Sequence, residues 1–233
     1  MKWYRIKAKA NNAAEVLIYG DIGESWWGDS VIAKEFIQEI NALDVDTMAV
    51  RINSYGGSVS DGVAIFNALR RHKAAITTSI DGAAYSIASL IAMAGDTVEM
   101  AENAMLMIHA PWTGLYGNAV DMRDAADMLD KMAEAMTTSY TRGGRGPALS
   151  DIEALLKDGA DHWFTASEAQ AMGLVDEVIA AMPMAAMFKQ NRFTQPAAAA
   201  ASPKEHTMPK SIEPAATPNP VPASTNEPAA SGG

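Results

Sequence analysis

Ser86 is the residue whose type and position in this chain most suggest chemistry. It lies in the segment GAAYSIASLIAMAGD, residues 82 to 96, where small residues lead into a serine at the start of an apolar helix. The first N–H groups of a helix have no partner within it, and the helix dipole is positive at that end. A serine there is well placed to act as a nucleophile. Serine is also a common N-cap, and for the position alone this structural role is the more common explanation.

A glycine pair forms the second candidate feature. In the segment RINSYGGSVSDG, residues 51 to 62, a strand-like run breaks at Gly56 and Gly57, and an amphipathic helix follows. Glycines at such a turn allow the backbone to approach a bound chain closely. A loop that merely needs positive φ has the same composition, and for a lone glycine pair this is the more common case.

His109 is the third candidate. It ends the apolar segment MLMIHAP, residues 105 to 111, and Pro111 stops the strand. A single histidine on an apolar strand is more often a core residue with satisfied hydrogen bonds than a catalyst. Each of the three features is weak by itself.

Taken together, in this order and spacing, the segments resemble the proteolytic subunit of the Clp protease, a serine peptidase of the ClpP/crotonase fold. That family has a strand ending INSPGG, a GxAAS serine segment, an MIHQP histidine segment and a late FxSAxEAxxxGLxD segment. This chain reads INSYGG, GAAYS, MIHAP and WFTASEAQAMGLVD. The similarity covers roughly residues 16 to 180, and the 29-residue offset from Gly57 to Ser86 is that of the family.

The resemblance implies a role for each motif residue. Ser86 is expected to be the nucleophile and His109 the general base. The N–H groups of Gly57 and Ile87 are expected to form the oxyanion hole. The family also assembles into stacked rings, in which the long helix expected at residues 118 to 141 reaches an opposing ring.

Two residues depart from the family pattern. Tyr55 replaces the proline before the glycine pair, and Tyr85 replaces the alanine before the serine. Both residues are bulkier and are expected to reshape the substrate groove while leaving the chemistry in place. Because phage-encoded relatives tolerate such changes, we expect a divergent, phage-type head maturation protease.

The acid of the triad is the least determined member. An acid must hold the imidazole tautomer and stabilise the imidazolium that forms. Asp158 lies 49 residues after His109, the family separation, and has a similar local pattern, KDG. Ungapped alignment from residue 163 places Lys157 there instead, so this assignment needs a one-residue deletion. Asp158 is our choice; the alternatives, in order, are Asp161 and then Glu153 and Asp176.

Alternating strand and helix patterns predict an α/β fold of repeated strand-helix units with parallel strands. A capping box is expected at residues 165 to 168, before a short helix that stops at Gly173. The expected strands are 16 to 22, 47 to 52, 75 to 80, 97 to 100, 105 to 109 and 174 to 179, and the expected helices are 30 to 43, 58 to 71, 86 to 94 and 118 to 141.

Composition divides the chain into two parts. Residues 1 to 188 form the expected peptidase domain, and residues 189 to 233 an expected disordered tail that holds eight of the eleven prolines. The tail has hardly any large apolar side chains with which to form a core.

Composition also restricts the function. The chain has no cysteine, which allows a cytoplasmic location, and its net charge of −10 argues against nonspecific nucleic-acid binding. We find no signal peptide, membrane span, metal-ligand spacing or phosphate-binding loop, and expect neither cofactor nor metal.

The expected activity is that of a serine endopeptidase within an oligomeric ring. Its expected partners are a polypeptide substrate, further copies of the chain, and either an ATPase unfoldase or capsid and scaffold proteins. Two alternatives remain at this stage. One is a crotonase-fold acyl-CoA enzyme, which shares the two-N–H oxyanion hole, and the other is a catalytically silent ring or scaffold protein.

Overall fold

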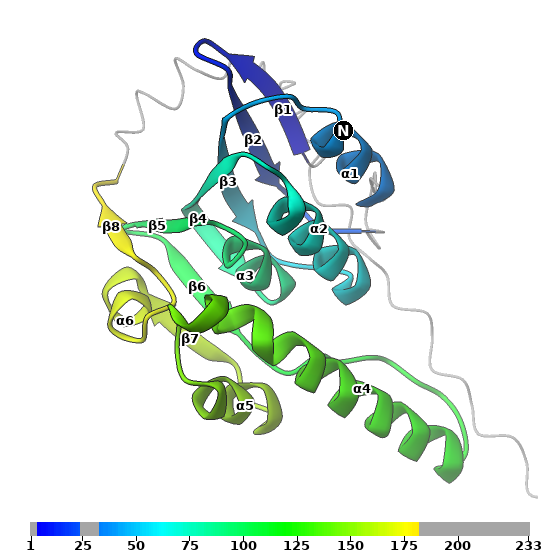
Figure 1. The fold of residues 1–233 in the computed structure, drawn as a ribbon. Coiled ribbons are helices and arrows are strands. Elements are labelled where there is room, and N and C mark those ends of the chain that lie inside the picture. The colour runs from blue at the N-terminus through cyan, green and yellow to red at the C-terminus, as the bar shows by residue number, and fades with distance from the viewer. Residues whose placement is uncertain (1–3, 24–32, 182–233) are drawn as a thin grey trace, which may run out of the picture. The chain divides into compact units, whose positions relative to one another are not determined.

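The computed structural model describes residues 4–23 and 33–181 (Figure 1). The expected disordered tail lies outside these residues. The strands are β1 Tyr4–Lys9, β2 Ala13–Tyr19, β3 Thr47–Ser54, β4 Ala75–Tyr85, β5 Thr97–Ala101, β6 Met105–Ile108, β7 His162–Thr165 and β8 Glu177–Ile179. The helices are α1 Ala33–Asn41, α2 Val59–Arg71, α3 Ile87–Ala92, α4 Ala119–Tyr140, the 3₁₀ turn η1 Arg142–Gly144, α5 Leu149–Lys157 and α6 Ala166–Ala171.

The strands form a mixed sheet in the order β1-β2-β3-β4-β5-β8; off this order, β6 pairs with β4, and β7 pairs with β6. All pairs from β2 to β8 along this order are parallel, as is the pair of β4 with β6. The pairs β1–β2 and β6–β7 are antiparallel. The expected α/β architecture, with helical crossovers between parallel strands, is therefore confirmed.

The core forms where one face of the sheet meets the helices. Alternate residues of the central strands are fully buried, such as Val16 on β2 and Val50 on β3. Helices α1, α2 and α3 cover this face (Figure 1) and contribute side chains such as Phe36 and Leu69. Burial of these apolar side chains is the main favourable contribution to folding.

Strand β4 divides its pairing between two neighbours on one side. Its first half pairs with β5 from Thr77 to Ile80, and its last three residues pair with β6 from Ala83 to Tyr85. The other edge of β4 pairs with β3 along most of its length. The end of β4 therefore points into the region where β6, β7 and α3 meet.

Most expected elements are present, with shifted boundaries. The capping box of α6 is confirmed, because Thr165 accepts from Glu168 N while the Glu168 carboxylate accepts from Thr165 N. Strands β1 and β7 were not expected from the sequence. The first of these is an edge strand, and β7 is only four residues long. Residues 30 to 32 of the helix expected at 30 to 43 lie outside the described residues, and α1 covers Ala33–Asn41.

An ion pair between a buried arginine and a partly exposed aspartate fastens the turn after α4 to the sheet. The guanidinium of Arg142 is fully buried and donates from Nη1 to Asp176 Oδ1 at 2.9 Å and from Nη2 to Asp176 Oδ2. Asp176 Oδ2 also accepts from Val98 N on β5 at 2.7 Å. These contacts, Arg142 above all, hold the pKa of the Asp176 carboxyl below its usual value. Asp176, a minor candidate for the triad acid, therefore has a structural role in this fold.

We predict that Asp176→Asn lowers the melting temperature by about 5 to 10 °C at pH 7, because it leaves a buried guanidinium without its countercharge. A carboxyl whose pKa falls on folding stabilises the protein above its unfolded pKa, and this contribution is lost as the pH falls through the folded pKa. The difference between wild type and variant should therefore shrink only in strong acid. Thermal scans from pH 7 to pH 3 measure it, with Glu177→Gln as the control.

Candidate active site

Ser86 joins the end of β4 to the first turn of α3 in an unusual backbone conformation. Its φ of 54° and ψ of −130° lie outside the regions that residues with a Cβ normally occupy. Its N–H donates to Met107 O on β6 at 2.9 Å, which anchors the turn to the neighbouring strand. Such strain costs on the order of 1 to 3 kcal/mol and is found mainly at functional sites.

The Ser86 side chain points to His109. Its Oγ lies 2.8 Å from Nε2 of the imidazole, and it makes no capping hydrogen bond to α3. The structural explanation of Ser86 as an N-cap is therefore wrong. A serine hydroxyl within hydrogen-bond reach of an imidazole nitrogen is the arrangement of an activated nucleophile and its base.

His109 has a carboxylate on its other side. Its Nδ1 lies 3.2 Å from Asp161 Oδ1. When Nε2 accepts a hydrogen bond from the Ser86 hydroxyl, the ring proton must be on Nδ1. The Nδ1–H then donates a hydrogen bond to this carboxylate. The imidazole side chain is 18% exposed and the Asp161 side chain 56%, so the pair lies at the surface of the fold.

His109 contacts Asp161, our second choice for the acid, whereas Asp158, our first choice, contacts His162. In the antiparallel β6–β7 pair, Ile108 lies opposite His162. Continuing this register by one residue places His109 opposite Asp161, on the same face. The register depends on β7, which the sequence analysis did not identify.

Asp158 lies at the C-terminal end of α5 and has other partners. Its carboxylate accepts from Ala160 N at 2.9 Å and lies 3.0 Å from His162 Nε2. The Ala160 N–H and, next in size, the His162 imidazole hold the pKa of the Asp158 carboxyl below its usual value. Glu153, another candidate acid, lies on α5 and does not contact His109. Among the described residues, Asp161 alone places a carboxylate against His109.

The glycine pair lies directly against Ser86. A Cβ on Gly56 would come within 2.7 Å of the Ser86 Cβ and 3.3 Å of Ile87 N. Gly57 has a φ of 145°, and a Cβ there would lie 2.1 Å from Ile22 O. Side chains at both positions are therefore excluded by Ser86 and Ile22 of the same chain.

Two backbone N–H groups near Ser86 are available to donate a hydrogen bond to a ligand, one in the glycine turn and one at the start of α3. Gly57 forms a parallel bridge with Ile22, in which Ile22 N donates to Gly56 O and Ser58 N donates to Ile22 O. Because these bonds use the residues flanking Gly57, its own N–H points to the opposite side. Ile87 is the first residue of α3, so its N–H has no partner within the helix.

A row of aromatic rings borders the site. Tyr85 pairs with Met107, and Met107 pairs with Trp163, so the three side chains share one face of the sheet. The Tyr85 ring contacts Tyr55 at 5.4 Å and Trp163 at 5.0 Å between centroids. We call the rings of Tyr55, Tyr85 and Trp163 the aromatic row. His109 is two residues beyond Met107, so the row lies one pleat, roughly 7 Å, from the imidazole.

The sequence analysis noted Tyr55 and Tyr85 but missed Trp163. Tyr55 is 73% exposed and Trp163 50% exposed, although large apolar rings are usually buried. The signal for Trp163 was the alternation in the segment HWFT, which places Trp163 on the same face as Asp161, the residue just before the strand.

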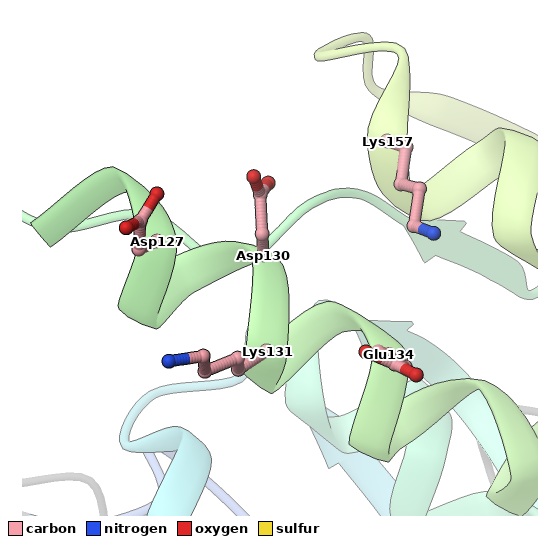
Figure 2. A pocket seen from close by; sticks show the side chains of 5 residues that line it. All are labelled: Asp127, Asp130, Lys131, Glu134 and Lys157. Carbon is pink, nitrogen blue, oxygen red and sulfur yellow. The ribbon is translucent and has the colours of Figure 1, made fainter. Parts of the chain in front are cut away.

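A cleft of about 350 Å³ lies elsewhere, between α4 and α5. Figure 2 shows that its lining side chains come from these two helices, and all of them are charged: Asp127, Asp130, Lys131, Glu134 and Lys157. Neither Ser86 nor His109 lines it. The opposite charges and the absence of a nucleophile give this cleft no part in the chemistry.

Two other features are absent from the described part of the chain. Within it, no group of three or more His, Asp or Glu side chains is arranged to hold a metal ion. In the same residues, no helix combines the length and the apolar composition needed to cross a membrane.

Comparison with known proteins agrees with the geometry. A family model described as Clp protease matches residues 1–182. The chain is also 33% identical over 147 residues to the ATP-dependent Clp protease proteolytic subunit 3 of Streptomyces coelicolor, strain ATCC BAA-471 / A3(2) / M145. The match covers 60% of this chain and 64% of that protein, so the chain spans a little under two thirds of the length of this curated relative.

We predict that a fluorophosphonate probe modifies the protein at Ser86, because the hydroxyl is hydrogen-bonded to an imidazole base. Mass spectrometry of the digested protein locates the adduct. Ser60→Ala, which removes an exposed serine of α2, is the control and should label normally. Labelling that persists in Ser86→Ala would exclude Ser86.

Proposed function

The chain belongs to the Clp protease family, and we propose that it is a serine peptidase with Ser86 as nucleophile. The observation that carries this proposal is the 2.8 Å contact between Ser86 Oγ and His109 Nε2. The strained backbone of Ser86 and the Asp161 carboxylate on the far side of the imidazole support it. The named activity of the curated relative is consistent with it.

The reaction follows from these positions. Ser86 Oγ attacks the carbonyl carbon of a peptide bond while His109 Nε2 takes the serine proton. The tetrahedral intermediate collapses with cleavage of the C–N bond, and His109 returns the proton to the leaving amine. A water molecule, deprotonated by His109, then attacks the acyl-serine ester; the ester C–O bond breaks, His109 returns the proton to Ser86 Oγ, and the second product leaves. Asp161 holds the Nδ1–H tautomer and stabilises the imidazolium in both stages.

The N–H groups of Gly57 and Ile87 are assigned to the oxyanion hole. The negative charge on the carbonyl oxygen grows as the tetrahedral intermediate forms, and fixed backbone donors stabilise it without reorganisation. The contact of the glycine turn with Ser86 and Ile87 supports this assignment, since it brings both donors to the nucleophile. A side chain at Gly57 would displace the turn from Ile22 and therefore the first donor.

The aromatic row is assigned to substrate binding. Its exposed rings lie beside the nucleophile on the face that carries His109, where a side chain flanking the scissile bond must pass. Flat apolar rings bind such a side chain through buried area and ring contacts.

Assembly and partners are also part of the proposal. We assign the chain to an oligomeric ring that cleaves polypeptides, and the exposed apolar residues on α4, Val120, Met122 and Met128, are consistent with contacts between copies. An ATPase unfoldase fits the name of the curated relative, and capsid or scaffold proteins fit a phage head maturation role. Tyr55 and Tyr85 are the residues that favour this divergent role. The absence of cysteine is consistent with a cytoplasmic location.

The two alternative functions have no specific support. An acyl-CoA enzyme would share the two N–H donors but has no need for a serine bonded to histidine. A silent scaffold would have no reason to keep the strained conformation of Ser86.

We predict that Asp161→Asn lowers kcat for peptide cleavage on the order of 10³- to 10⁴-fold, because Nδ1 of His109 is no longer held as a donor. Asp158→Asn is the matched control, a carboxylate three positions earlier that contacts His162 instead. Its kcat should stay within about threefold of wild type. Steady-state kinetics on a fluorogenic peptide measure both variants. A larger loss in Asp158→Asn would return the acid to that residue.

Tyr55→Ala should raise KM for peptides with a large apolar residue beside the scissile bond by about 3- to 10-fold, because the most exposed ring of the aromatic row is lost. The kcat should change little, since Ser86 and His109 keep their contact. Peptides with alanine at the same position provide the comparison and should show a smaller effect. Equal changes for both peptides would remove the aromatic row from substrate selection.

Light scattering coupled to size-exclusion chromatography tests the assembly. We predict a particle several times the 24.7 kDa mass of the chain, because the apolar residues exposed on α4 need a partner surface. Met122→Glu together with Met128→Glu should reduce the particle size, since both side chains are exposed on α4. A wild-type protein that elutes as a monomer would contradict the ring.

A further inference from the structure

Two buried hydroxyl groups connect the end of α4 to the backbone of the nucleophile. The Tyr140 hydroxyl lies 2.8 Å from Ser89 Oγ, and Ser89 Oγ donates to Ser86 O at 2.6 Å. Tyr140 is the last residue of α4, and Ser89 lies in the first turn of α3. Tyr140 is 1% exposed and Ser89 is fully buried, so water does not compete for these bonds. We call this chain of hydrogen bonds the hydroxyl relay.

The direction of the relay is fixed by its acceptor. A carbonyl oxygen only accepts, so the single proton of the Ser89 hydroxyl is used in the bond to Ser86. The Tyr140 hydroxyl must therefore donate to Ser89 Oγ. Burial raises the pKa of the Tyr140 hydroxyl, which keeps its proton at neutral pH and allows this donation.

The relay acts on the peptide unit that contains the second oxyanion donor. The carbonyl of Ser86 and the N–H of Ile87 belong to one planar unit and point in opposite directions. Ser86 O also accepts from Ser89 N at 3.0 Å. Two hydrogen bonds on this carbonyl therefore fix the direction of the Ile87 N–H. Hydrogen bonds in a chain also polarise one another, so the same bonds make this N–H a stronger donor.

The conformation of Ser86 explains why such support is needed. Its ψ of −130° sets the orientation of the peptide unit, and together with a φ of 54° it is an unfavourable combination for serine. A strained conformation persists only when the surroundings hold it. The Ser86 N–H is held by Met107 O, and its C=O is held by the relay.

We propose that Tyr140 and Ser89 are positioning residues that aim the Ile87 N–H at the oxyanion, an inference that rests on the proposed peptidase function. Neither hydroxyl contacts the substrate. Through Tyr140, the last turn of α4 is coupled to the oxyanion hole. A displacement of α4 at Tyr140 therefore weakens stabilisation of the transition state without moving the Ser86–His109 contact.

The test compares Ser89→Ala, Tyr140→Phe and the double variant with wild type. Each substitution removes one hydroxyl and keeps most of the packing volume. We expect kcat to fall about 10-fold in Ser89→Ala and about 3- to 10-fold in Tyr140→Phe, less than for complete loss of an oxyanion donor, because the N–H remains but is less well aimed. KM should stay within about twofold. The double variant should be no slower than Ser89→Ala, since both changes break the same chain.

Thr137→Val is the matched control for loss of a buried hydroxyl. Thr137 lies on α4, one turn before Tyr140; it is 1% exposed, and its Oγ1 donates to Ala133 O within the helix. This variant should lose a similar amount of thermal stability and keep the wild-type kcat. A peptide aldehyde, whose adduct with Ser86 places an oxygen in the oxyanion hole, gives a second measurement. Its Ki should rise in the relay variants by the factor by which kcat falls.

Several results would overturn the relay alone. These are wild-type kcat in Ser89→Ala, a loss that appears in KM, multiplicative losses in the double variant, or the same loss in Thr137→Val. They count against the relay when the wild-type protein is labelled at Ser86 and cleaves peptide. A wild-type protein that does neither overturns the proposed peptidase function, and the catalytic part of the relay with it.

Discussion

The left-handed backbone of Ser86 is the constraint on which the rest of the site depends. A strand normally directs successive side chains to opposite faces, and Ser86 follows Tyr85, which points into the aromatic row. The positive φ interrupts this alternation and lets Ser86 Oγ reach the imidazole on the same face. The neighbouring elements hold the strained turn: β6 through Met107 O, the glycine turn through close contact, and α3 through Ser89.

The second requirement is the pairing of β6 with β7. The register of this four-residue pair places Trp163 opposite Met107 and, continued by one residue, Asp161 opposite His109. The proposed triad acid and one wall of the proposed substrate site therefore both depend on the same strand. A slip of one residue would turn both side chains to the other face. Thr165 is both the last residue of β7 and the N-cap of α6. The capping box therefore fixes where β7 ends, which helps to define this register.

The sequence predicted the α/β class, most helices and the Ser86–His109 pair, because apolar periodicity and motif spacing are local signals. It ranked Asp161 second as the partner of His109, because that choice depends on β7. A strand of four residues carries little periodicity, and the turn at Gly159, with a φ of 76°, decides how the chain enters it. The hydroxyl relay was beyond sequence reasoning, since Tyr140 and Ser89 are 51 residues apart and are joined only by packing of α4 on α3.

A crystal structure of the protein after reaction with a fluorophosphonate tests the central claim most directly. The account predicts phosphorus bonded to Ser86 Oγ and the phosphoryl oxygen within about 3 Å of the N–H groups of Gly57 and Ile87. His109 Nδ1 should remain paired with Asp161. A phosphoryl oxygen that faces solvent, or an imidazole that pairs with Asp158, would contradict it.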